Sequence, residues 1–208
     1  MQGIPLNERK RLGALLDDRP QTEVMAMIPQ FSQAETDNFV APPAQIPEAL
    51  GVLMFNMERG VNLPEIQEFL RDCPDIQPFD VILANELDDG CARSGNKNTA
   101  RELAQAFGLN YAWGLEFIEL VNDENAKGFH GNAVFSRWPI RRAGVIRLPE
   151  QYNWYFDRQK RIGGRLAVFA ELDVGGQPVG AVSIHLENRT HGEGRKAQMA
   201  AILEAVRK

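Results

Sequence analysis

The feature that most constrains the fold is an almost continuous apolar run, FDVILANE, at residues 79–86. An apolar run of strand length without alternation is typical of a strand buried on both faces. A similar run, LGVLMFNME, occupies residues 50–58, and Ile66, Phe69 and Leu70 repeat with helical spacing between the two. The order strand, helix, strand predicts a layered α/β fold.

The rest of the chain adds a second helix, a series of strands and a closing helix. Thr99 and Glu102 form a capping box, T-x-x-E, that predicts the start of a helix, and Gly108 predicts its end. Gly175 and Gly176 can both take positive φ, so we expect a hairpin there. The strand candidates are YAWGLEFIEL, NAVFSRWPI, AGVIRLP, RLAVFAELDV and PVGAVSIHLE. The closing helix is predicted from an apolar stripe at Met199, Ile202, Leu203 and Val206.

The first 48 residues differ from the rest, and we predict that they form an N-terminal extension or linker before a domain at residues 49–208. A short helix is expected near Glu8 to Leu16, followed by a surface wrap. Scattered polar residues and prolines leave no sustained strand pattern in this segment. These prolines are Pro20, Pro29, Pro42, Pro43 and Pro47.

Composition excludes several classes of protein. A formal net charge of -5 over 208 residues argues against a broad basic surface for nucleic acid. Cys73 and Cys91 are too few for a disulfide framework. No stretch approaches the ~18 apolar residues that cross a bilayer, and no secretory signal is visible. We therefore expect a cytoplasmic protein without a transmembrane segment.

Polar residues interrupt the apolar pattern near the ends of three strands. Asn56 ends the row Val52, Met54; Glu86 follows two apolar residues in DVILANE; and His185 lies in AVSIHLEN. Each has an ordinary interpretation: a backbone-capping amide, a carboxylate paired with Arg or Lys, and a core histidine. Because burying such groups without partners costs several kcal/mol, three of them at strand ends favour a ligand site.

The residue types indicate which ligand this site would hold. A carboxylate oxygen and an amide oxygen are hard ligands that suit Mg²⁺ or Mn²⁺ better than zinc. A nearby imidazole can donate to a phosphate oxygen or transfer a proton near neutral pH. Together they predict metal-assisted attack of water on phosphorus.

A basic and aromatic segment lies between Arg137 and Arg165. Guanidinium groups would suit a phosphate-bearing substrate, with rings available for base stacking, but a solvated face with half-buried aromatics is an equal alternative. The aromatic residues are Trp138, Tyr152, Trp154, Tyr155 and Phe156. Candidate substrate-binding residues in the loops before it are Arg93, Asn96, His130 and Asn132.

The ordered words LGVLMFNMERG, DVILANELDDG, GFHGNAVFSRWPI, GGRLAVFAELDV and AVSIHLEN resemble the endonuclease/exonuclease/phosphatase superfamily over residues 50–208. The phrases ARSGN, FHGNAVFSR and HLEN are similar to a bacterial branch of that family. The resemblance implies a four-layer α/β/β/α sandwich of the deoxyribonuclease-like type. It also implies that Asn56 lies at the metal and phosphate site, that Glu86 binds the metal, and that His185 hydrogen-bonds the phosphate.

The resemblance departs from the family at the C-terminal end. Family members continue with a strand carrying Gly-Asp-x-Asn and end with an Asp-His pair, and this sequence contains neither. We expect a fragment of a longer gene product that lacks the C-terminal strands, because an end here would leave a sheet edge open. A natural truncation and completion by a separate chain are the alternatives.

The function expected from these features is Mg²⁺-dependent hydrolysis of a phosphate ester, with this chain inactive by itself. The alternative is a catalytically dead module that binds a phosphate ligand or nucleic acid. DNA, RNA, phospholipid and inositol phosphate all remain open as substrates, and the oligomeric state is not predicted.

Overall fold

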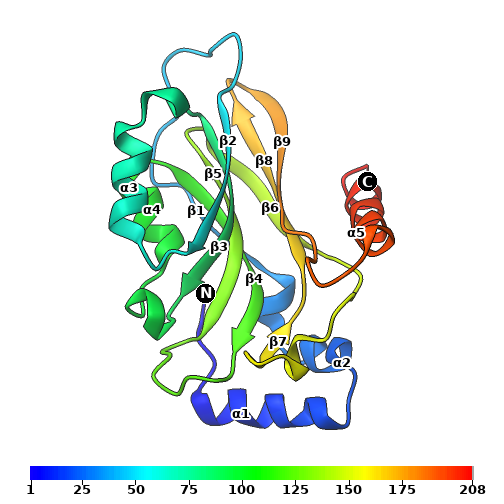
Figure 1. The fold of residues 1–208 in the computed structure, drawn as a ribbon. Helices are drawn as coiled ribbons and strands as arrows, with labels where there is room; N and C mark the ends of the chain where they lie inside the picture. Colours follow the sequence, from blue (N-terminus) through cyan, green and yellow to red (C-terminus); the bar gives the residue numbers. More distant parts are fainter. Residues whose placement is uncertain (208) are drawn as a thin grey trace.

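A computed structural model of the protein describes residues 1–207 and contains two β-sheets packed face to face (Figure 1). The main sheet has the strand order β1-β4-β5-β3-β2, with β7 paired to β4, and the minor sheet has the order β6-β8-β9. The strands of the main sheet are β1 (Ala34–Asp37), β2 (Val52–Arg59), β3 (Val81–Asp89), β4 (Asn110–Glu119), β5 (Phe129–Ser136) and β7 (Arg161–Gly163). The strands of the minor sheet are β6 (Ile140–Arg147), β8 (Leu166–Val174) and β9 (Gln177–Ile184).

Helices cover the outer faces of the two sheets. Helices α3 and α4 lie outside the main sheet and α5 lies on the side of the minor sheet, so the layer order is α/β/β/α (Figure 1). The predicted fold class is therefore confirmed. The helices are α1 (Leu6–Ala14), α2 (Gln21–Ala26), α3 (Leu63–Asp72), α4 (Thr99–Phe107) and α5 (Gly192–Ala205). The short 3-10 turns are η1 (Leu15–Asp17), η2 (Pro29–Ser32), η3 (Pro74–Ile76), η4 (Ala92–Ser94) and η5 (Trp154–Phe156).

The apolar run at residues 79–86 lies within the main sheet, as its composition predicts. Strand β3 pairs in parallel with β2 and antiparallel with β5, so both of its edges are occupied. Its connection from β2 runs through α3, the crossover that a parallel pair requires. Between the two sheets, Val81 and Val134 pack with Val168 and Leu172 of the minor sheet.

Helix α4 forms where predicted, but its N-cap is not the predicted one. Asn98 is the N-cap residue, and its side chain accepts a hydrogen bond from the backbone N–H of Arg101. Thr99 lies one position inside the helix, and its hydroxyl donates to the backbone carbonyl of Asp88 at 2.8 Å. The prediction of a capping box at Thr99 and Glu102 is therefore wrong, because the hydroxyl of Thr99 bonds to β3 instead of capping the helix. The predicted end is confirmed, since Gly108 takes a left-handed conformation at φ 58°.

The predicted hairpin between β8 and β9 is confirmed. Val174 pairs with Gln177, and the two turn residues Gly175 and Gly176 have φ values of 59° and 89°. Glycine takes these positive φ values without the steric cost that a Cβ would bring. His185 follows β9 directly. Strand β9 of the minor sheet and β3 of the main sheet end on the same side of the sandwich (Figure 1).

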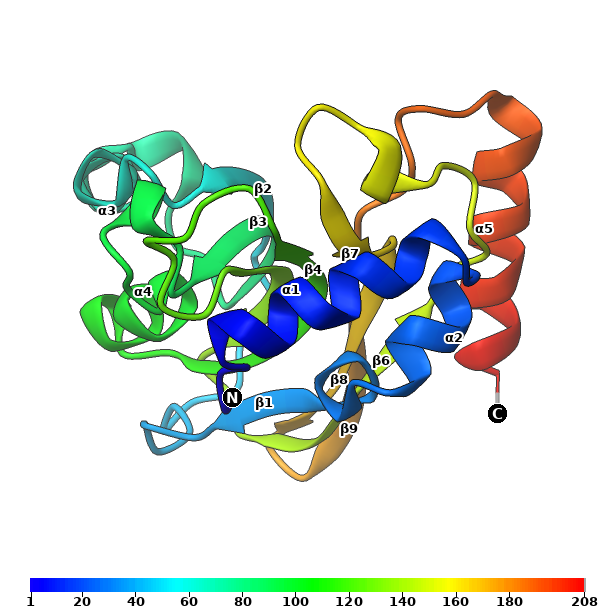
Figure 2. The ribbon, with the colours of Figure 1, turned by 90° about the horizontal axis from the view of Figure 1, so that it is seen from below.

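The first 48 residues contain a helix near the predicted position and also a strand that the sequence did not predict. Strand β1 pairs antiparallel with β4, and α1 runs across the end of the sandwich (Figure 2). Apolar side chains of this segment join the main core; they are Leu12, Leu16, Val24, Ile28 and Phe31. The segment thus packs on the sandwich, while the division at residue 48 stays a prediction.

One side of the sandwich leaves apolar side chains exposed. Strands β2 and β9 are the outermost strands of their sheets, and Met54 on β2 is 75% exposed. On α5 only Ile202 of the predicted apolar stripe is buried, whereas Met199, Leu203 and Val206 remain exposed. The stripe therefore contributes less to the core than its spacing predicts. No helix within residues 1–207 is long and apolar enough to cross a membrane.

Candidate functional site

Glu86 lies at a bulge in β3 that turns its side chain toward a cleft between the sheets. The pairing register with β5 shifts between Ala84 and Leu87, and Glu86 itself has φ 59°. Its backbone N–H donates to the side-chain oxygen of Asn132 at 3.1 Å. A non-glycine residue in the left-handed region is uncommon and clusters at functional sites, so the buried amide of Asn132 supports a strained position.

His185 of the minor sheet faces Glu86 of the main sheet. Its Nε2 atom lies 3.8 Å from Oε1 of Glu86, whose side chain is 25% exposed. Within residues 1–207 no arginine or lysine forms an ion pair with Glu86, so the ordinary interpretation of a paired carboxylate does not apply. Two of the three predicted strand-end residues therefore come together.

A second carboxylate, which the sequence analysis missed, lies behind His185. Glu116 on β4 has no exposed surface, and its carboxylate lies 3.4 Å from Nδ1 of His185 and 3.2 Å from Nη1 of Arg165. Burial alone would raise the pKa of Glu116, but the charges of Arg165 and His185 outweigh it and lower the pKa to about 2. The rule that singled out Glu86, a charge inside an apolar strand, also applies to Glu116 in GLEFI.

His130 lies on the other side of Glu116, with Nε2 at 3.7 Å from it. Its Nδ1 atom is 2.9 Å from Oδ1 of Asp88. Asp88 is fully buried within β3, and Arg93 donates two hydrogen bonds to it at 2.7 and 2.8 Å. Burial would raise the pKa of Asp88, but the hydrogen bonds from Arg93 and His130 lower it to about 2.

Two arginines of the basic segment pack against a buried tryptophan. Arg161 and Arg165 lie 5.1 and 5.2 Å from the ring centre of Trp154, whose Nε1 donates to Glu187 at 2.8 Å. Arg165 also forms ion pairs with Glu116 and Glu187. Trp138, Trp154 and Tyr155 are buried, whereas Tyr152 is half-buried and Phe156 is exposed. The availability of rings for base stacking therefore stays a prediction.

Some of these side chains line a cleft of about 230 Å³. Its lining carries more positive than negative charge, and two of its arginines keep Trp154 covered. A cleft with this lining suits a small anionic group. The lining residues are Arg59, Glu86, His130, Trp154, Asp157, Gln159, Arg161, Arg165, Asn188 and Arg189.

Three predicted site residues have other contacts. Asn56 is exposed on β2 next to Asn85, and its side-chain oxygen accepts from the backbone N–H of Glu58. Arg93 is committed to Asp88 and Glu119. The side chain of Asn96 forms hydrogen bonds with the backbone of residues 124 and 126. The roles of the predicted site residues stay predictions, and the geometry favours Glu86, His185, His130 and Asn132 over these three.

A metal ion would find few ligands here. Among residues 1–207 no group of three or more His, Cys, Asp or Glu side chains is arranged to hold one. Glu86 brings a single carboxylate to the cleft beside His185, and a hydrated Mg²⁺ commonly takes only one or two protein carboxylates with water and phosphate oxygens. The donors fit such a hydrated ion and do not fit a site built entirely from protein ligands.

Comparison with known proteins supports the fold. No protein-family model matches the chain, and no curated protein matches it significantly. Among solved structures, an endonuclease/exonuclease/phosphatase from Beutenbergia cavernae DSM 12333 has 22% identity and a TM-score of 0.54 over 74% of this chain and 43% of that one. An endonuclease/exonuclease/phosphatase family protein from Leptotrichia buccalis C-1013-b has 19% identity and a TM-score of 0.51 over 76% of this chain and 63% of that one.

The chain therefore has a fold like that of endonuclease/exonuclease/phosphatase proteins, and the resemblance predicted from sequence is confirmed at the level of the fold. The chain spans 43% and 63% of the lengths of these two proteins.

Proposed function

We propose that this protein is a phosphoric ester hydrolase that depends on Mg²⁺ or Mn²⁺, and that the arginine-lined cleft binds the phosphate group of its substrate. The observation that carries the proposal is the meeting of Glu86 and His185, which two different sheets bring to 3.8 Å beside that cleft. The fold shared with endonuclease/exonuclease/phosphatase proteins supports the same class of reaction.

In this proposal Glu86 would hold the metal ion, and the remaining ligands would be water and phosphate oxygens. When bound, the ion would polarise the phosphoryl oxygen and make its bound water more acidic. Asn132 holds the backbone of Glu86, so it acts by positioning the carboxylate rather than by touching the substrate.

Other residues in and beside the cleft would bind and orient the phosphate. His185 presents Nε2 toward Glu86, while its Nδ1 lies against Arg165 and Glu116, which fix the ring. Arg59 and Arg189 line the cleft and supply positive charge to a phosphate oxygen. Because the phosphate group is common to DNA, RNA, phospholipid and inositol phosphate, this cleft does not discriminate among them.

The resemblance implies that the groups that orient the attacking water and stabilise the leaving oxygen belong to a Gly-Asp-x-Asn strand and an Asp-His pair, neither of which this sequence contains. We therefore expect residues 1–207 to bind phosphate and to hydrolyse esters only together with additional groups. A second candidate function is a binding module without catalysis, which would use the same arginine-lined cleft.

The test is a Glu86→Gln variant of the full gene product, assayed on bis(p-nitrophenyl) phosphate with and without Mg²⁺. We expect the divalent-dependent rate to fall by about 100-fold or more, the scale of losing an electrostatic contact to the transition state. The matched control is Glu65→Gln on the exposed surface of α3, which should leave the rate unchanged. A Glu86→Gln variant with the wild-type rate would remove Glu86 from the site.

Titration with inorganic phosphate separates the two candidate functions. Saturable binding to the cleft with no hydrolysis of a panel of phosphate esters by the full gene product would favour the binding module. Hydrolysis that requires a divalent ion would favour the enzyme.

A further inference from the structure

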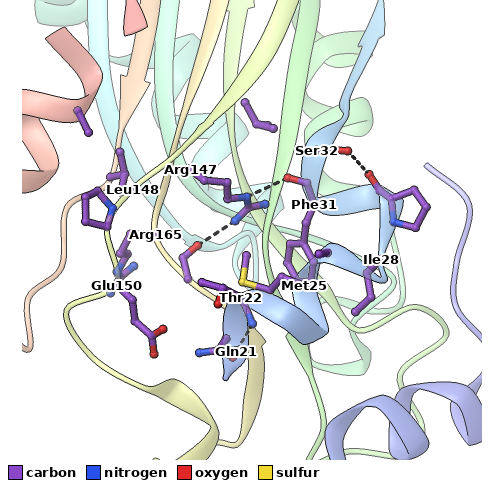
Figure 3. A pocket seen from close by; sticks show the side chains of 17 residues that line it. Gln21, Thr22, Met25, Ile28, Phe31, Ser32, Arg147, Leu148, Glu150 and Arg165 are labelled. Atoms are coloured by element: carbon purple, nitrogen blue, oxygen red, sulfur yellow. Dashed lines mark hydrogen bonds between the residues drawn. The ribbon is translucent and has the colours of Figure 1, made fainter. Parts of the chain in front are cut away.

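A second and larger cavity, of about 720 Å³, lies away from Glu86 (Figure 3). Four segments that are far apart in sequence form it: residues 21–32, residues 145–150, residues 163–165 and Ala201 of α5. Its volume lies within the range of about 300 to 1,000 Å³ that is usual for small-molecule sites.

The walls of this cavity are mostly apolar. Met25, Ile28 and Phe31 come from the N-terminal segment, and Val145 and Leu148 come from β6 and the residue that follows it. Two of the polar lining residues bind within the protein: Gln21 accepts from the backbone N–H of Gly163, and Ser32 donates to the carbonyl of Pro29. Such a lining favours an apolar group over water.

One wall carries a half-buried cation, Arg147, whose guanidinium bonds to backbone carbonyls. Its guanidinium donates to the backbone carbonyls of Phe31 at 2.9 Å, Gly164 at 3.0 Å and Leu115, and it stacks on the Phe31 ring at 4.8 Å (Figure 3). These bonds use three of its five N–H groups. Within residues 1–207 no carboxylate forms an ion pair with Arg147. Burial lowers the pKa of Arg147 to about 9, and the charge of Glu116 offsets this effect only in part.

The other charged residues of the lining do not supply a counter-ion to Arg147. The charge of Arg165 is already balanced by Glu116 and Glu187. Glu150 is exposed to solvent, where water and salt screen its carboxylate. An anion placed inside the cavity would therefore meet Arg147 in a poorly screened environment.

We propose that this cavity binds an amphiphilic anion, a molecule with an apolar chain or ring and a single acidic group. The apolar part would lie against Met25, Ile28 and Leu148, and the acidic group would face Arg147. The proposal does not rest on the proposed hydrolase chemistry, although Arg165 lines both this cavity and the cleft at Glu86. The cavity gives the N-terminal segment a role in binding because that segment forms one wall.

The proposal is tested with three probes that share an eight-carbon chain: octanoate, 1-octanol and octyltrimethylammonium, each titrated into the ¹⁵N-labelled chain below its micelle concentration. We expect saturable shifts at residues 21–32 with octanoate, and an affinity at least tenfold higher than that of either other probe. Equal affinities for the three probes, or no saturable binding of octanoate, would overturn the proposal.

Variants locate the site and test its charge. Ala201→Phe fills the cavity from α5 and should abolish octanoate binding, whereas Ala205→Phe, on an exposed position of the same helix, should not. Glu150→Lys reverses an exposed charge at the lining and should tighten octanoate binding several-fold without affecting the fold. Arg147→Met should weaken it at least tenfold if the variant folds, and the other two variants decide the matter if it does not. Octanoate binding that survives Ala201→Phe would place the ligand elsewhere.

Discussion

Asp88 and Glu116 are carboxylates without exposed surface, and cations that touch them hold each one ionised. A buried charge is tolerated only when ion pairs and hydrogen bonds replace the water it has lost. Glu86 differs, because its only ionisable contact within residues 1–207 is His185. The difference separates carboxylates that the protein uses for its own structure from one that is available to a ligand.

Replacing Asp88 with asparagine should destabilise the protein. Arg93 and His130 would keep their positions but lose the charge they share, and breaking a buried pair costs about 3 kcal/mol or more. Urea unfolding at pH 7 measures the loss, and Asp75→Asn on the exposed turn after α3 is the matched control.

The same variant has a predicted pH dependence. Because the pKa of Asp88 is lowered to about 2 in the folded state, its stabilising contribution is fully present above its unfolded pKa of about 4 and is lost as the pH falls toward 2. The stability difference between wild type and Asp88→Asn should therefore shrink between about pH 4 and pH 2. A difference that stays constant across that range would contradict the ionised state of Asp88.

Sequence reasoning at this scale found the residues that break an apolar strand but not the partners of those residues. Glu86 and His185 interrupt strands that are buried by pattern, so both could be found. Arg165 and Glu187 lie in different segments and meet only after the sheets pack, and no local pattern indicates that contact. Asn56 interrupts its strand in the same way, but it lies on an edge strand and is exposed to water, so its site role stays a prediction.

At the scale of elements, local signals predicted most helices and strands but not their caps. The hairpin at Gly175 and Gly176 and the end of α4 at Gly108 follow from backbone conformation, which is a local property. Strand β1, AETD, has no apolar pattern and exists because β4 offers it a partner. Thr99 matches a capping pattern, yet its hydroxyl bonds to a strand that is distant in sequence until the chain folds.

The cap of α4 gives a prediction that distinguishes the two neighbouring residues. Asn98→Ala should lower the free energy of unfolding by about 1 kcal/mol, because it leaves the N–H of Arg101 without its side-chain acceptor. Asn98→Ser keeps an acceptor and should lose less. Chemical denaturation of the two variants checks the prediction, and equal midpoints would show that the cap is not the source of the stability.

At the scale of the whole molecule, the N-terminal segment shares one core with the main sheet. Leu12, Leu16, Val24, Ile28 and Phe31 are buried there. Burying one such side chain contributes about 1.5–3 kcal/mol, so the set contributes on the order of 10 kcal/mol, comparable with the stability of a whole domain.

We therefore expect a variant without residues 1–33 to lose its cooperative unfolding transition and to bind the dye ANS. Thermal and urea unfolding measure the first effect, and dye fluorescence measures the second. A Met27→Ser variant, which changes an exposed residue of the same segment, should unfold like the wild type. Cooperative unfolding of the shortened chain would instead support an extension that is separate from the domain.

Trp154 has a consequence for how the protein can be observed. The chain has three tryptophans, and Trp113 and Trp138 lie in the interior while Trp154 lies between Arg161 and Arg165 at the cleft. The fluorescence emission of an indole responds to nearby charge. An anion that draws these two guanidinium groups toward itself should therefore change the emission of Trp154, while the emission of Trp113 and Trp138 stays constant. Trp154 is therefore an intrinsic fluorescent probe of the cleft, and a Trp154→Phe variant should lose the change in emission that follows anion binding.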